Sequence, residues 1–587
     1  MENTPAGSTK SSPPAPVSSE RAGAGATEPS SRDPGPADAV SEGLRAQHGL
    51  TFTGADVLHR LAVPSAELTK WLDPKLSGLT SPAGMADREA ATERIARAIT
   101  KGERICIFGD YDCDGITAAA VLTSVVRALG GVAVPLLATR MEGAYGLSAP
   151  ALARVKATGA TLLVTCDCGS SDHERLEDAR RSGIDVVVID HHLVPKDPLP
   201  ALAFLNPHRP ECEFPFKHLA SCGLALSMGA ALRQALKREL DLRPMLDLVA
   251  IGTVADVAPL VGDNRALVRA GLRVLGAGVR PGIRALADLA RIDLSRGMTS
   301  EDIGFRIAPR LNAPGRLGHP DESLELLLTR DHDIAAGLAA SIEQTQLQRR
   351  QVQAQMLEEA LADIEEMRLD ALAGVVVARQ GWHPGVVGIV AGKLAETLGK
   401  PTIVIGLEGA SGRGSVRGPT GFPLYDALTD CRADLAGYGG HQAAAGVHVR
   451  SDRIDALRAS WHATCAVRSR GLGGTGCEST ARLDPRDPLA RVLDDFDRFE
   501  PFGEANPMPL LYLPEVEVIA AKNLKGHLKL DLAHGRAPLT GIYFSMGECA
   551  PAVAGKTFTM IGALRRNTFQ GGAELQVRST WPRLPLP

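Results

Sequence analysis

Residues 104–115 read RICIFGDYDCDG, an apolar run of strand length that is followed by a glycine and a cluster of carboxylates. The cluster consists of Asp110, Asp112 and Asp114. Residues 116–129 have helical character, so the aspartates stand where a buried strand passes into a helix. Three carboxylates in five residues repel one another unless a cation neutralises them. The stretch therefore predicts a strand–turn–helix unit that carries a divalent cation site.

This motif has two other interpretations when it is taken alone. An EF-hand loop also begins with D-x-D-x-D-G, but its twelfth position is Val121 here instead of a bidentate Glu, and no helix precedes it. A turn whose aspartates are merely solvated is the other alternative. The segments that follow along the chain decide between these readings.

Short apolar runs alternate with Ala/Leu-rich stretches of helical length after residue 104. The further runs are 132–137, 161–165 and 185–189. This alternation is typical of βαβ units, in which helices cover both faces of a parallel sheet. Asp167 and the triplet Asp190–His192 follow two of the runs. Because the carboxyl ends of parallel strands line one crevice, we expect these side chains to meet the first aspartates there.

The chemistry of these residues favours Mn²⁺ or Mg²⁺ over zinc. Carboxylates with an imidazole suit the harder divalent ions, and a further acid, Asp256, follows the apolar stretch 248–254. Cys166 and Cys168 flank Asp167, but strand alternation directs both thiols away from the side that the aspartate presents. We interpret both cysteines as small core residues.

The rest of the chain divides into segments of different composition. Residues 1–42 are rich in Pro, Ser, Ala and Gly and are expected to be disordered. The predicted order after this tail is a helical cap (43–100), a first α/β unit (101–330), a connecting helix (331–370), a second α/β unit (371–470) and a small β barrel (477–587). The barrel follows a Gly-rich linker, Gly471–Gly476.

Composition limits the class of protein. The chain has 587 residues, a formal net charge of −4 and ten cysteines with no C-x-x-C pair, which predicts a cytoplasmic, reduced, multidomain protein. No apolar run reaches membrane-spanning length, so no membrane partner is expected. A chain of this charge does not coat duplex DNA, and positive charge for a nucleic acid must be local.

Four motifs resemble the signatures of the DHH phosphoesterase superfamily. They are Gly109–Gly115, Asp167, Asp190–His192 and Gly252–Asp256. The resemblance implies two bound Mn²⁺ or Mg²⁺ ions, with Asp167 as the bridging ligand. The implied metal ligands are Asp112, Asp114, Asp167, His191 and Asp256, and catalytic roles beside them fall to Asp190 and His192. Some relatives have a ligand His where this chain has Phe108, and Asp110 is the candidate to replace it.

Longer motifs are similar to the RecJ family within this superfamily. They are Arg140 with Glu142–Ser148, Ala308–Arg316, Trp382–Ala391, Gly412–Gly418, Gly439–Gly446, Pro501–Pro507 and His527–Leu530. Ala144 looks like an insertion, and Gly418 and Ala505 replace residues usual in the family. The similarity covers residues 44–587 and implies a DHH catalytic domain, a DHH-associated substrate-binding domain and an OB-like single-strand-binding domain.

The resemblance also implies how a substrate is bound. Guanidinium forks, a hydroxyl and close backbone approach suit phosphate. The implied substrate-binding residues are Arg140, Arg310, Asn312, Arg316, Ser415, Arg417 and His441. Of these, Arg310, Ser415 and Arg417 would hold a terminal 5′ phosphate. The barrel would supply a basic, partly aromatic platform, for which the candidates are Lys525, Lys529, Arg565, Arg566, Tyr512, Phe544 and Phe569.

The implied activity is metal-dependent 5′→3′ degradation of single-stranded DNA to mononucleotides in repair and recombination. The implied partners are single-stranded DNA with a 5′ end, a helicase and a single-strand-binding protein. One alternative is a DHH phosphodiesterase for short oligoribonucleotides or cyclic dinucleotides, whose relatives usually lack the barrel. A non-catalytic replication scaffold is another, but such a protein is expected to lose the ligands that this chain retains.

Overall fold

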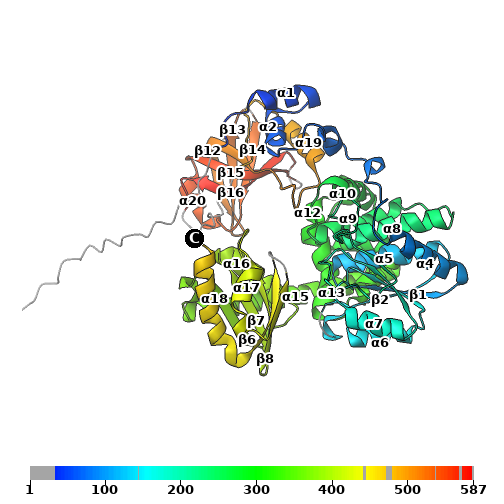
Figure 1. Cartoon of the computed structure of the whole chain (residues 1–587). Helices are drawn as coiled ribbons and strands as arrows, with labels where there is room; N and C mark the ends of the chain where they lie inside the picture. Colours follow the sequence, from blue (N-terminus) through cyan, green and yellow to red (C-terminus); the bar gives the residue numbers. More distant parts are fainter. Residues whose placement is uncertain are drawn as a thin grey trace, which may run out of the picture.

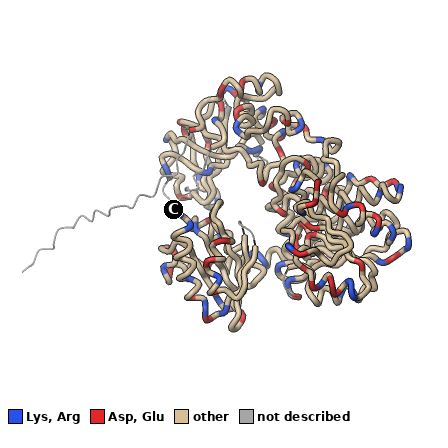
Figure 2. The backbone as a smooth tube through the Cα atoms, viewed as in Figure 1, with Lys and Arg blue, Asp and Glu red and all other residues tan. Residues whose placement is uncertain are grey.

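The computed structural model describes residues 33–142, 145–440, 444–470, 479–535, 537–567 and 571–584. These residues form a first α/β domain, a second α/β domain and a barrel domain. The first is called the DHH domain below, after the motifs that it resembles, and the helix α15 (His332–Glu366) leads from it to the second domain (Figure 1). No helix among them has the length and apolar character required to cross a bilayer. Basic and acidic residues alternate along the backbone in all three domains, as the colours in Figure 2 show.

The DHH domain is built on a parallel sheet with the strand order β2-β1-β3-β4-β5. Its strands are β1 (Arg104–Gly109), β2 (Val132–Leu137), β3 (Leu162–Cys166), β4 (Asp185–Ile189) and β5 (Ala203–Leu205). Side chains alternate across it: Ile105 and Ile107 join one apolar core, and Cys106 and Phe108 join another. The predicted sheet, buried on both faces, is therefore confirmed.

Helices cover both faces of this sheet. The cover consists of α4 (Arg88–Lys101), α5 (Cys113–Ala128), α8 (Ser221–Ala235) and α9 (Leu246–Ala255) on one face and α6 (Ala149–Ala157) and α7 (His173–Arg181) on the other. The domain continues through α10 (Gly262–Gly276), α11 (Pro281–Leu289), α12 (Ser300–Asp302), the π-helical turn Ile303–Ile307, α13 (Ala308–Leu317) and α14 (Asp321–Leu328). Both cores are thus sealed from solvent, which leaves the carboxyl ends of the strands as the open edge.

The second α/β domain has a mixed sheet with the order β6-β7-β8-β10-β9. Its strands are β6 (Val375–Gln380), β7 (Thr402–Glu408), β8 (Ser411–Arg417), β9 (Gly437–Gly440) and β10 (Ala445–Arg450). Its helices are α16 (Val387–Leu398), α17 (Leu424–Asp430) and α18 (Ile454–Arg468). Both α15 and this domain lie where the sequence pattern predicts them.

Five strands of the third domain close into a barrel, because β12 pairs with β15 as well as with β13. The elements are β11 (Ala481–Arg482), α19 (Leu489–Phe499), β12 (Leu511–Leu524), β13 (His527–His534), β14 (Ala537–Tyr543), α20 (Ala550–Val553), β15 (Thr557–Arg566) and β16 (Ala573–Trp581). The alternating apolar stretches 516–520, 528–532, 539–544 and 558–562 predict the strands β12 to β15. They miss β16, which pairs with β14 and β15 to complete the closure.

The predicted helical cap is divided between two domains. Helices α1 (Ala39–His48), α2 (Phe52–Arg60) and α3 (Leu68–Leu72) pack on the barrel, whereas α4 belongs to the DHH core. The N–H and the hydroxyl of Thr51 both donate to Asp495, at 2.8 and 2.7 Å. The expected unit 43–100 is therefore wrong, because apolar periodicity shows that a helix has a buried face but not which core buries it.

The boundary of the predicted disordered tail also changes. Helix α1 begins at Ala39, inside the expected segment 1–42, because the carboxylate of Asp38 accepts a hydrogen bond from the N–H of Ser41 at 2.9 Å and caps the helix. Residues 1–32 of that tail and the linker Gly471–Gly476 lie outside the described residues.

Arginines of α10 join the barrel domain to the DHH domain. The Nε of Arg265 donates to the carbonyl of Trp71 at 2.9 Å, and its Nη2 donates to that of Phe499 at 3.0 Å. The Nη1 of Arg269 donates to the carbonyl of Glu500 at 2.6 Å. Two of these acceptors lie at the carboxyl end of α19, where a cation is also favoured by the helix dipole.

Two of the departures from the family can be judged here. Ala505 has φ +58, a left-handed conformation that suits glycine, so the alanine holds a slightly strained turn. A Cβ at Gly418 would lie 3.2 Å from Leu424, so the loop is tight at that position. Ala144 lies outside the described residues.

Candidate metal centre and phosphate site

The first aspartate motif is held by backbone N–H groups. Asp112 is the N-cap of α5, and its Oδ1 accepts from the N–H groups of Asp114 and Gly115 at 3.1 and 3.2 Å. The two oxygens of Asp114 accept from Ser221 and Cys222, the first residues of α8, at 2.6 and 2.9 Å. The buried carboxylate of Asp114 is thereby fixed between the N-termini of α5 and α8.

A glycine brings the fourth motif to the same place. A Cβ at Gly252 of α9 would lie 2.3 Å from the hydroxyl of Thr117 and 2.9 Å from Asp114 Oδ1, so only glycine allows α9 this close to α5. Asp256 is the C-cap of α9, four residues later. The motif Gly252–Asp256 therefore combines a packing residue with a carboxylate, and the carboxylate follows a helix, not a strand.

Asp167 lies at the centre and has an unusual backbone. Its φ is +64°, and its N–H still donates to the carbonyl of Ile189 at 2.9 Å. Oδ1 accepts from the hydroxyl of Ser221 at 3.1 Å, and the phenol of Tyr145 donates to its carbonyl oxygen. A left-handed aspartate is uncommon, and such strain collects at functional sites.

Asp190 and His192 form a charged pair behind the centre. Asp190 accepts from the N–H groups of Ser170 and His191, at 3.1 and 2.8 Å, and from Nδ1 of His192 at 2.7 Å. Although burial opposes ionisation, the His192 and Ser170 hydrogen bonds hold the pKa of Asp190 at about 2. Burial likewise opposes the charge of His192, but Asp190 raises its pKa to about 9. The pair is therefore aspartate and imidazolium at neutral pH.

His191 is the residue on which the carboxylates converge. Its Nε2 lies 3.2 Å from Asp167 Oδ1, 3.7 Å from Asp256 Oδ2 and 3.9 Å from Asp114 Oδ2. This buried nitrogen forms no hydrogen bond within the described part of the chain. Two groups of donor atoms, each within 4.8 Å, share it: Asp167, His191 and His192, and Asp114, His191 and Asp256.

These donors fit divalent cations. Burial and the neighbouring Asp114 raise the pKa of Asp256 to about 9 and that of Asp167 well above its usual range. The carboxylates cannot all ionise together without a compensating positive charge. Oxygen donors with a shared imidazole suit Mn²⁺ or Mg²⁺, and ion binding would return both groups to their charged form.

Not all of the residues predicted for this centre join a donor group. Asp112 and Asp110 belong to neither donor group, so their ligand roles remain predictions. Burial and then Asp112 raise the pKa of Asp110 well above its usual range. Phe108 is fully buried in the core beneath α6 and α7. Cys166 and Cys168 are buried free thiols in the two cores, as predicted.

Unpaired guanidinium groups adjoin the carboxylates. Arg140 lies over the ring of Tyr111, with Cζ 4.0 Å from the centroid, and its buried Nε has no hydrogen bond in the described chain. Burial, Arg140 and Arg349 lower the pKa of Arg316 to about 10, so these cations repel one another. None of the three forms an ion pair with a carboxylate that the structure describes. Asp110 and Asp112 offset part of this charge, and the three guanidinium groups together favour binding of an anion.

The second α/β domain provides polar groups on the other side of these arginines. The Nη1 of Arg417 donates to the hydroxyl of Ser415 at 2.8 Å, and a Cβ at Gly388 would lie 3.2 Å from that hydroxyl. Gly388 is in the first turn of α16, where N–H groups favour anions. The Nη1 of Arg316 donates to the carbonyl of Gly385, just before this turn, at 3.3 Å. Residues from both domains thus meet at one anion site.

Arg310 is already in an ion pair with a carboxylate. Its Nε and Nη2 donate to the carboxylate of Glu343 on α15, at 2.5 and 3.1 Å, and its Nη1 donates to the carbonyl of Arg306. Since the Nε and Nη2 of Arg310 are occupied by this carboxylate, its predicted role in holding a phosphate would require the ion pair to open, and that role stays a prediction. His441 lies outside the described residues.

A cavity of about 720 Å³ extends between the DHH domain, α15, α16 and the barrel domain. Asn312 and Arg316 line it, and Oδ1 of Asn312 is buried without a hydrogen bond in the described chain. Sequence reasoning missed several other lining residues: Phe305, Gln346, Arg349, Arg350 and Arg578. The adjacent arginines Arg349 and Arg350 in the long helix were a sequence signal for a basic channel. No sequence pattern indicated that Phe305 would be 73% exposed.

The barrel differs from the predicted basic platform. Lys529 pairs with Glu574 at 2.5 Å, and Arg565 pairs with Glu301 of the DHH domain. Arg566 pairs with Asp494 and Asp497 at 2.8 and 2.6 Å. Phe544 is 47% exposed, but Phe569 lies outside the described residues. Three of the four expected cations are therefore engaged in ion pairs, which the sequence pattern could not reveal.

Three known protein families match the three domains of the chain separately. Residues 104–253 match the DHH family, N-terminal domain, residues 372–466 match the DHHA1 domain, and residues 480–580 match the RecJ OB domain. The single-stranded-DNA-specific exonuclease RecJ of Dickeya dadantii is 40% identical over 87% of this chain and 93% of its own. That of Bacillus subtilis is 32% identical over 91% of this chain and 68% of its own. The crystal structure of Thermus thermophilus RecJ in complex with Mn²⁺ superposes with a TM-score of 0.77 at 29% identity, over 94% of this chain and 78% of that one.

Proposed function

The chain belongs to the RecJ family of exonucleases, and on that premise we propose that it hydrolyses single-stranded DNA from the 5′ end to mononucleotides, in repair and recombination. The observation that carries the proposal is one continuous site. Carboxylates converge on His191, and unpaired guanidinium groups of Arg140 and Arg316 adjoin them. A site with both features suits a phosphodiester in which one phosphate reacts and a neighbouring phosphate is held.

The residues that would hold two divalent ions are Asp114, Asp167, His191 and Asp256, with Asp112 as a further ligand. When bound, Mn²⁺ or Mg²⁺ supplies a hydroxide nucleophile and neutralises charge on the leaving 3′ oxygen. Ser221 orients the centre, since its N–H and its hydroxyl hold Asp114 and Asp167. The pair of Asp190 and His192 keeps an imidazolium 3.8 Å from Asp167 Oδ1, near the place of the developing charge.

The polarity would come from the anion site between the two α/β domains. Ser415, Arg417, Arg140 and Arg316 would bind a terminal 5′ phosphate, and the α16 N-terminus would add N–H donors. The cavity that Asn312, Arg349 and Phe305 line would receive the next nucleotides of a single strand. An exposed ring beside cations supports base stacking and backbone contact in such a channel.

A DHH phosphodiesterase for short oligonucleotides would use the same metal centre. The match of residues 480–580 to the RecJ OB domain favours the longer polymer. The non-catalytic scaffold is disfavoured because the donor residues are retained and lie together. A helicase and a single-strand-binding protein as partners, and a cytoplasmic location, stay predictions.

The deciding experiment is digestion of single strands labelled at the 5′ or the 3′ end, with Mn²⁺ and Mg²⁺ compared. We expect mononucleotide release from the 5′ end, dependent on either ion, and little cleavage of blunt duplex. Asp167→Asn serves as the inactive control. Release from the 3′ end, or equal rates on dinucleotides and long strands, would contradict the proposal and favour the short-oligonucleotide alternative.

A further inference from the structure

The residue after the candidate metal ligand Asp256 is a strained valine. Val257 has φ +59°, and it is the one β-branched residue with a left-handed backbone in the described part of the chain. It follows the C-cap of α9, and its N–H donates to the carbonyl of Val254 at 3.2 Å. Glycine is the usual residue at this position of a helix, because a β-branched side chain is strained on a left-handed backbone. Val257 therefore destabilises the turn relative to glycine.

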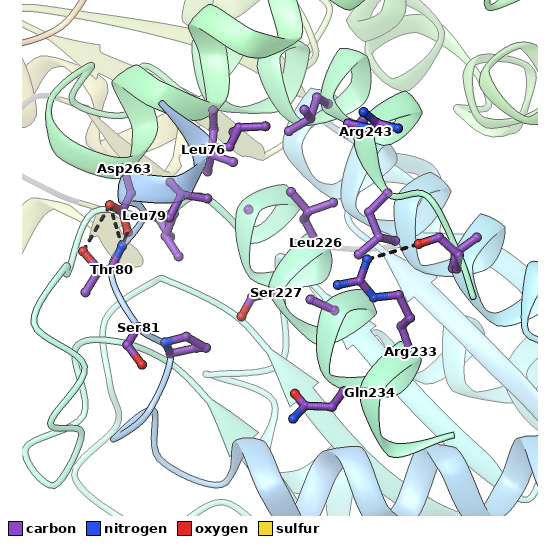
Figure 3. Close-up of a pocket in the computed structure, with 18 of the residues that line it drawn as sticks. Leu76, Leu79, Thr80, Ser81, Leu226, Ser227, Arg233, Gln234, Arg243 and Asp263 are labelled. Atoms are coloured by element: carbon purple, nitrogen blue, oxygen red, sulfur yellow. Dashed lines mark hydrogen bonds between the residues drawn. The ribbon is translucent and has the colours of Figure 1, made fainter. Parts of the chain in front are cut away.

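Packing does not explain the valine. Val257 is 62% exposed and joins none of the apolar cores of the described chain. A contrasting case is the cavity of about 1110 Å³ beside α8, where Leu76, Leu79 and Leu226 are also partly exposed (Figure 3). Those leucines pack against the core of the DHH domain with the rest of their surface. At Val257 no such packing offsets the strain, and unexplained strain of this kind collects at functional sites.

Val257 lines the cavity of about 720 Å³ that Asn312 also lines, which we call the channel. The channel has two kinds of lining residue from different elements. Apolar residues come from the end of α9, the π-helical turn and the start of α13, and they include Val254, Val257, Phe305 and Ala308. Cations come from the end of α13, from α15 and from β16: Arg316, Arg349, Arg350 and Arg578. A single strand suits this lining with its phosphates on the cations and its sugars and bases on the apolar residues.

A second irregular element contributes to the apolar lining. Phe305, which is 73% exposed, lies in the π-helical turn Ile303–Ile307. A Cβ at Gly304 of this turn would lie 3.9 Å from Cγ1 of Val254, so the turn packs beside the end of α9. Single π-helical turns are frequent at functional sites. Two irregular backbones thus present exposed apolar side chains to the same channel.

We propose that Val257 is a specificity-determining residue, which contacts the deoxyribose of the second nucleotide and disfavours a 2′-hydroxyl there. This inference rests on the proposed exonuclease function. The terminal nucleotide would lie between the anion site and the metal centre, so the second nucleotide is the first to enter the channel. Val257 directly follows Asp256, whose Oδ2 lies 3.7 Å from Nε2 of His191. The valine is therefore at the end of the channel that adjoins the metal centre.

The chemistry of the contact accounts for the selection. The C2′ of deoxyribose carries only hydrogens and suits the methyl groups of a valine. A 2′-hydroxyl pressed against the same methyl groups loses water without gaining a hydrogen-bond partner. One unsatisfied hydroxyl of this kind lowers binding or reaction by about tenfold or more. Glycine at position 257 would relieve the strain but would leave room for water to solvate the hydroxyl, so it would lose the selection.

The test compares the first cleavage of 5′-phosphorylated twelve-nucleotide strands under single-turnover conditions. One strand is all-deoxy, and the others carry a single ribonucleotide at position 1, 2 or 6. Ribose at position 2 should slow cleavage by wild type at least about tenfold, and ribose at position 6 should have no such effect. Val257→Gly and Val257→Asn both suit a left-handed backbone, and both should reduce the position-2 factor to below about threefold. Val257→Gly should melt at the same temperature as wild type or higher, because the strain is removed.

Two controls isolate the hydroxyl and the valine. Val279 is a matched residue, since it is 69% exposed and lines neither cavity. Val279→Asn should leave every rate within about twofold of wild type. A 2′-fluoro sugar at position 2 adopts the ribose pucker without a hydroxyl, and it should be cut within about threefold of deoxyribose. A loss with the fluoro sugar equal to that with ribose would overturn the apolar contact as the cause.

Equilibrium binding makes the test independent of turnover. In the Asp167→Asn enzyme, ribose at position 2 should weaken binding of the strand at least about fivefold, and Val257→Gly should abolish this difference. Equal cleavage and equal binding of the deoxy and position-2 strands by wild-type channels would overturn the proposal. So would an unchanged position-2 factor in Val257→Gly, or a factor that this variant relieves at position 1 instead. Release from the 5′ end of the all-deoxy strand would leave the proposed function intact in each of these cases. Without that release the proposed function fails, and the binding comparison alone decides the sugar contact.

Discussion

Arg310 and Arg316 lie six residues apart on one helix and have opposite environments. Arg310 is in a bidentate ion pair with Glu343, whereas Arg316 lies near Arg140 and Arg349 and forms no ion pair with a described carboxylate. The barrel cations Lys529, Arg565 and Arg566 resemble Arg310, since each is already paired. The difference shows that a basic residue can bind phosphate readily only where no carboxylate of the protein already forms an ion pair with it. Strand affinity should therefore concentrate between the two α/β domains.

The largest effect is expected when a carboxylate of the metal centre is removed and the unpaired arginines are left in place. Asp167→Asn keeps a side chain that tolerates φ +64° and should preserve the fold. We expect kcat to fall at least about 1000-fold, or about 4 kcal/mol, because the carboxylate that is predicted to bridge the two ions loses its charge. Binding of a 5′-phosphorylated single strand should change less than about threefold. Calorimetric Mn²⁺ titration and single-turnover cleavage check both parts, and more than a tenth of wild-type turnover would contradict the assignment of Asp167.

Removal of an unpaired cation should have the next largest effect on activity. Arg316→Ala should lower kcat/KM on 5′-phosphorylated strands about 100-fold, since charge-assisted contacts to phosphate are worth about 1.5–3 kcal/mol each. The loss should be much smaller on strands with a 5′ hydroxyl. Equal losses on both substrates would show that Arg316 does not read the terminal phosphate.

Arg310 provides the matched control on the same helix. Arg310→Ala should lower the melting temperature, because Glu343 is left half-buried without its partner, at a cost of about 3–5 kcal/mol for such pairs. The variant should retain its preference for a 5′ phosphate at temperatures where it is folded. Loss of that preference would place Arg310 at the anion site.

A hydrogen-bonded carboxylate at the domain interface gives a pH-dependent prediction. Burial raises the pKa of Glu500 to about 7, although the N–H of Phe502 and the hydroxyl of Ser300 hydrogen-bond to it. A raised pKa means that its contribution to stability is complete below about pH 4.5 and is lost as pH rises through about 7, by about 3 kcal/mol. Glu500→Gln should therefore gain melting temperature relative to wild type at pH 8 but not at pH 5. An equal difference at both pH values would show that Glu500 is ionised in the folded protein.

The smallest effect is expected on the barrel. Arg566→Gln removes a half-exposed cation that is bound to Asp494 and Asp497, and surface pairs of this kind contribute about 0–1 kcal/mol. KM for long strands and its salt dependence should change less than twofold. A clear decrease in the log–log salt slope, of about 0.7, would mean that Arg566 leaves its partners to contact a phosphate.

Most of the DHH domain could be predicted from the sequence because local patterns report local structure. The strands β2 and β4 begin and end where their apolar runs do, and α15 matches the polar pattern of residues 332–368, which has no Gly or Pro after Gly337. The convergence of Asp167 and His191 follows from parallel strands that end at one edge. These inferences require only periodicity and the geometry of a sheet.

Other features depend on contacts between distant segments and were not readable. Ser221 holds two carboxylates, but its only local signal is a position at the start of a helix. Glu343 neutralises Arg310 from another helix, and Glu574 does the same for Lys529. Side-chain pairing across the fold therefore decides which members of a motif are functional, and a single sequence does not encode that pairing in any short pattern.

The packing of α1–α3 on the barrel has a consequence for synthesis of the chain. Thr51 and Asp495, which hydrogen-bond, are separated by 444 residues. At about 5–20 residues per second, tens of seconds pass between their appearance at the ribosome. During that time Val57, Leu58 and Leu68 have no barrel to cover them. A truncated chain that lacks the barrel keeps this apolar surface exposed. Exposed apolar surface is what chaperones bind and proteases reach, so truncated chains should be recognised and full-length chains should not.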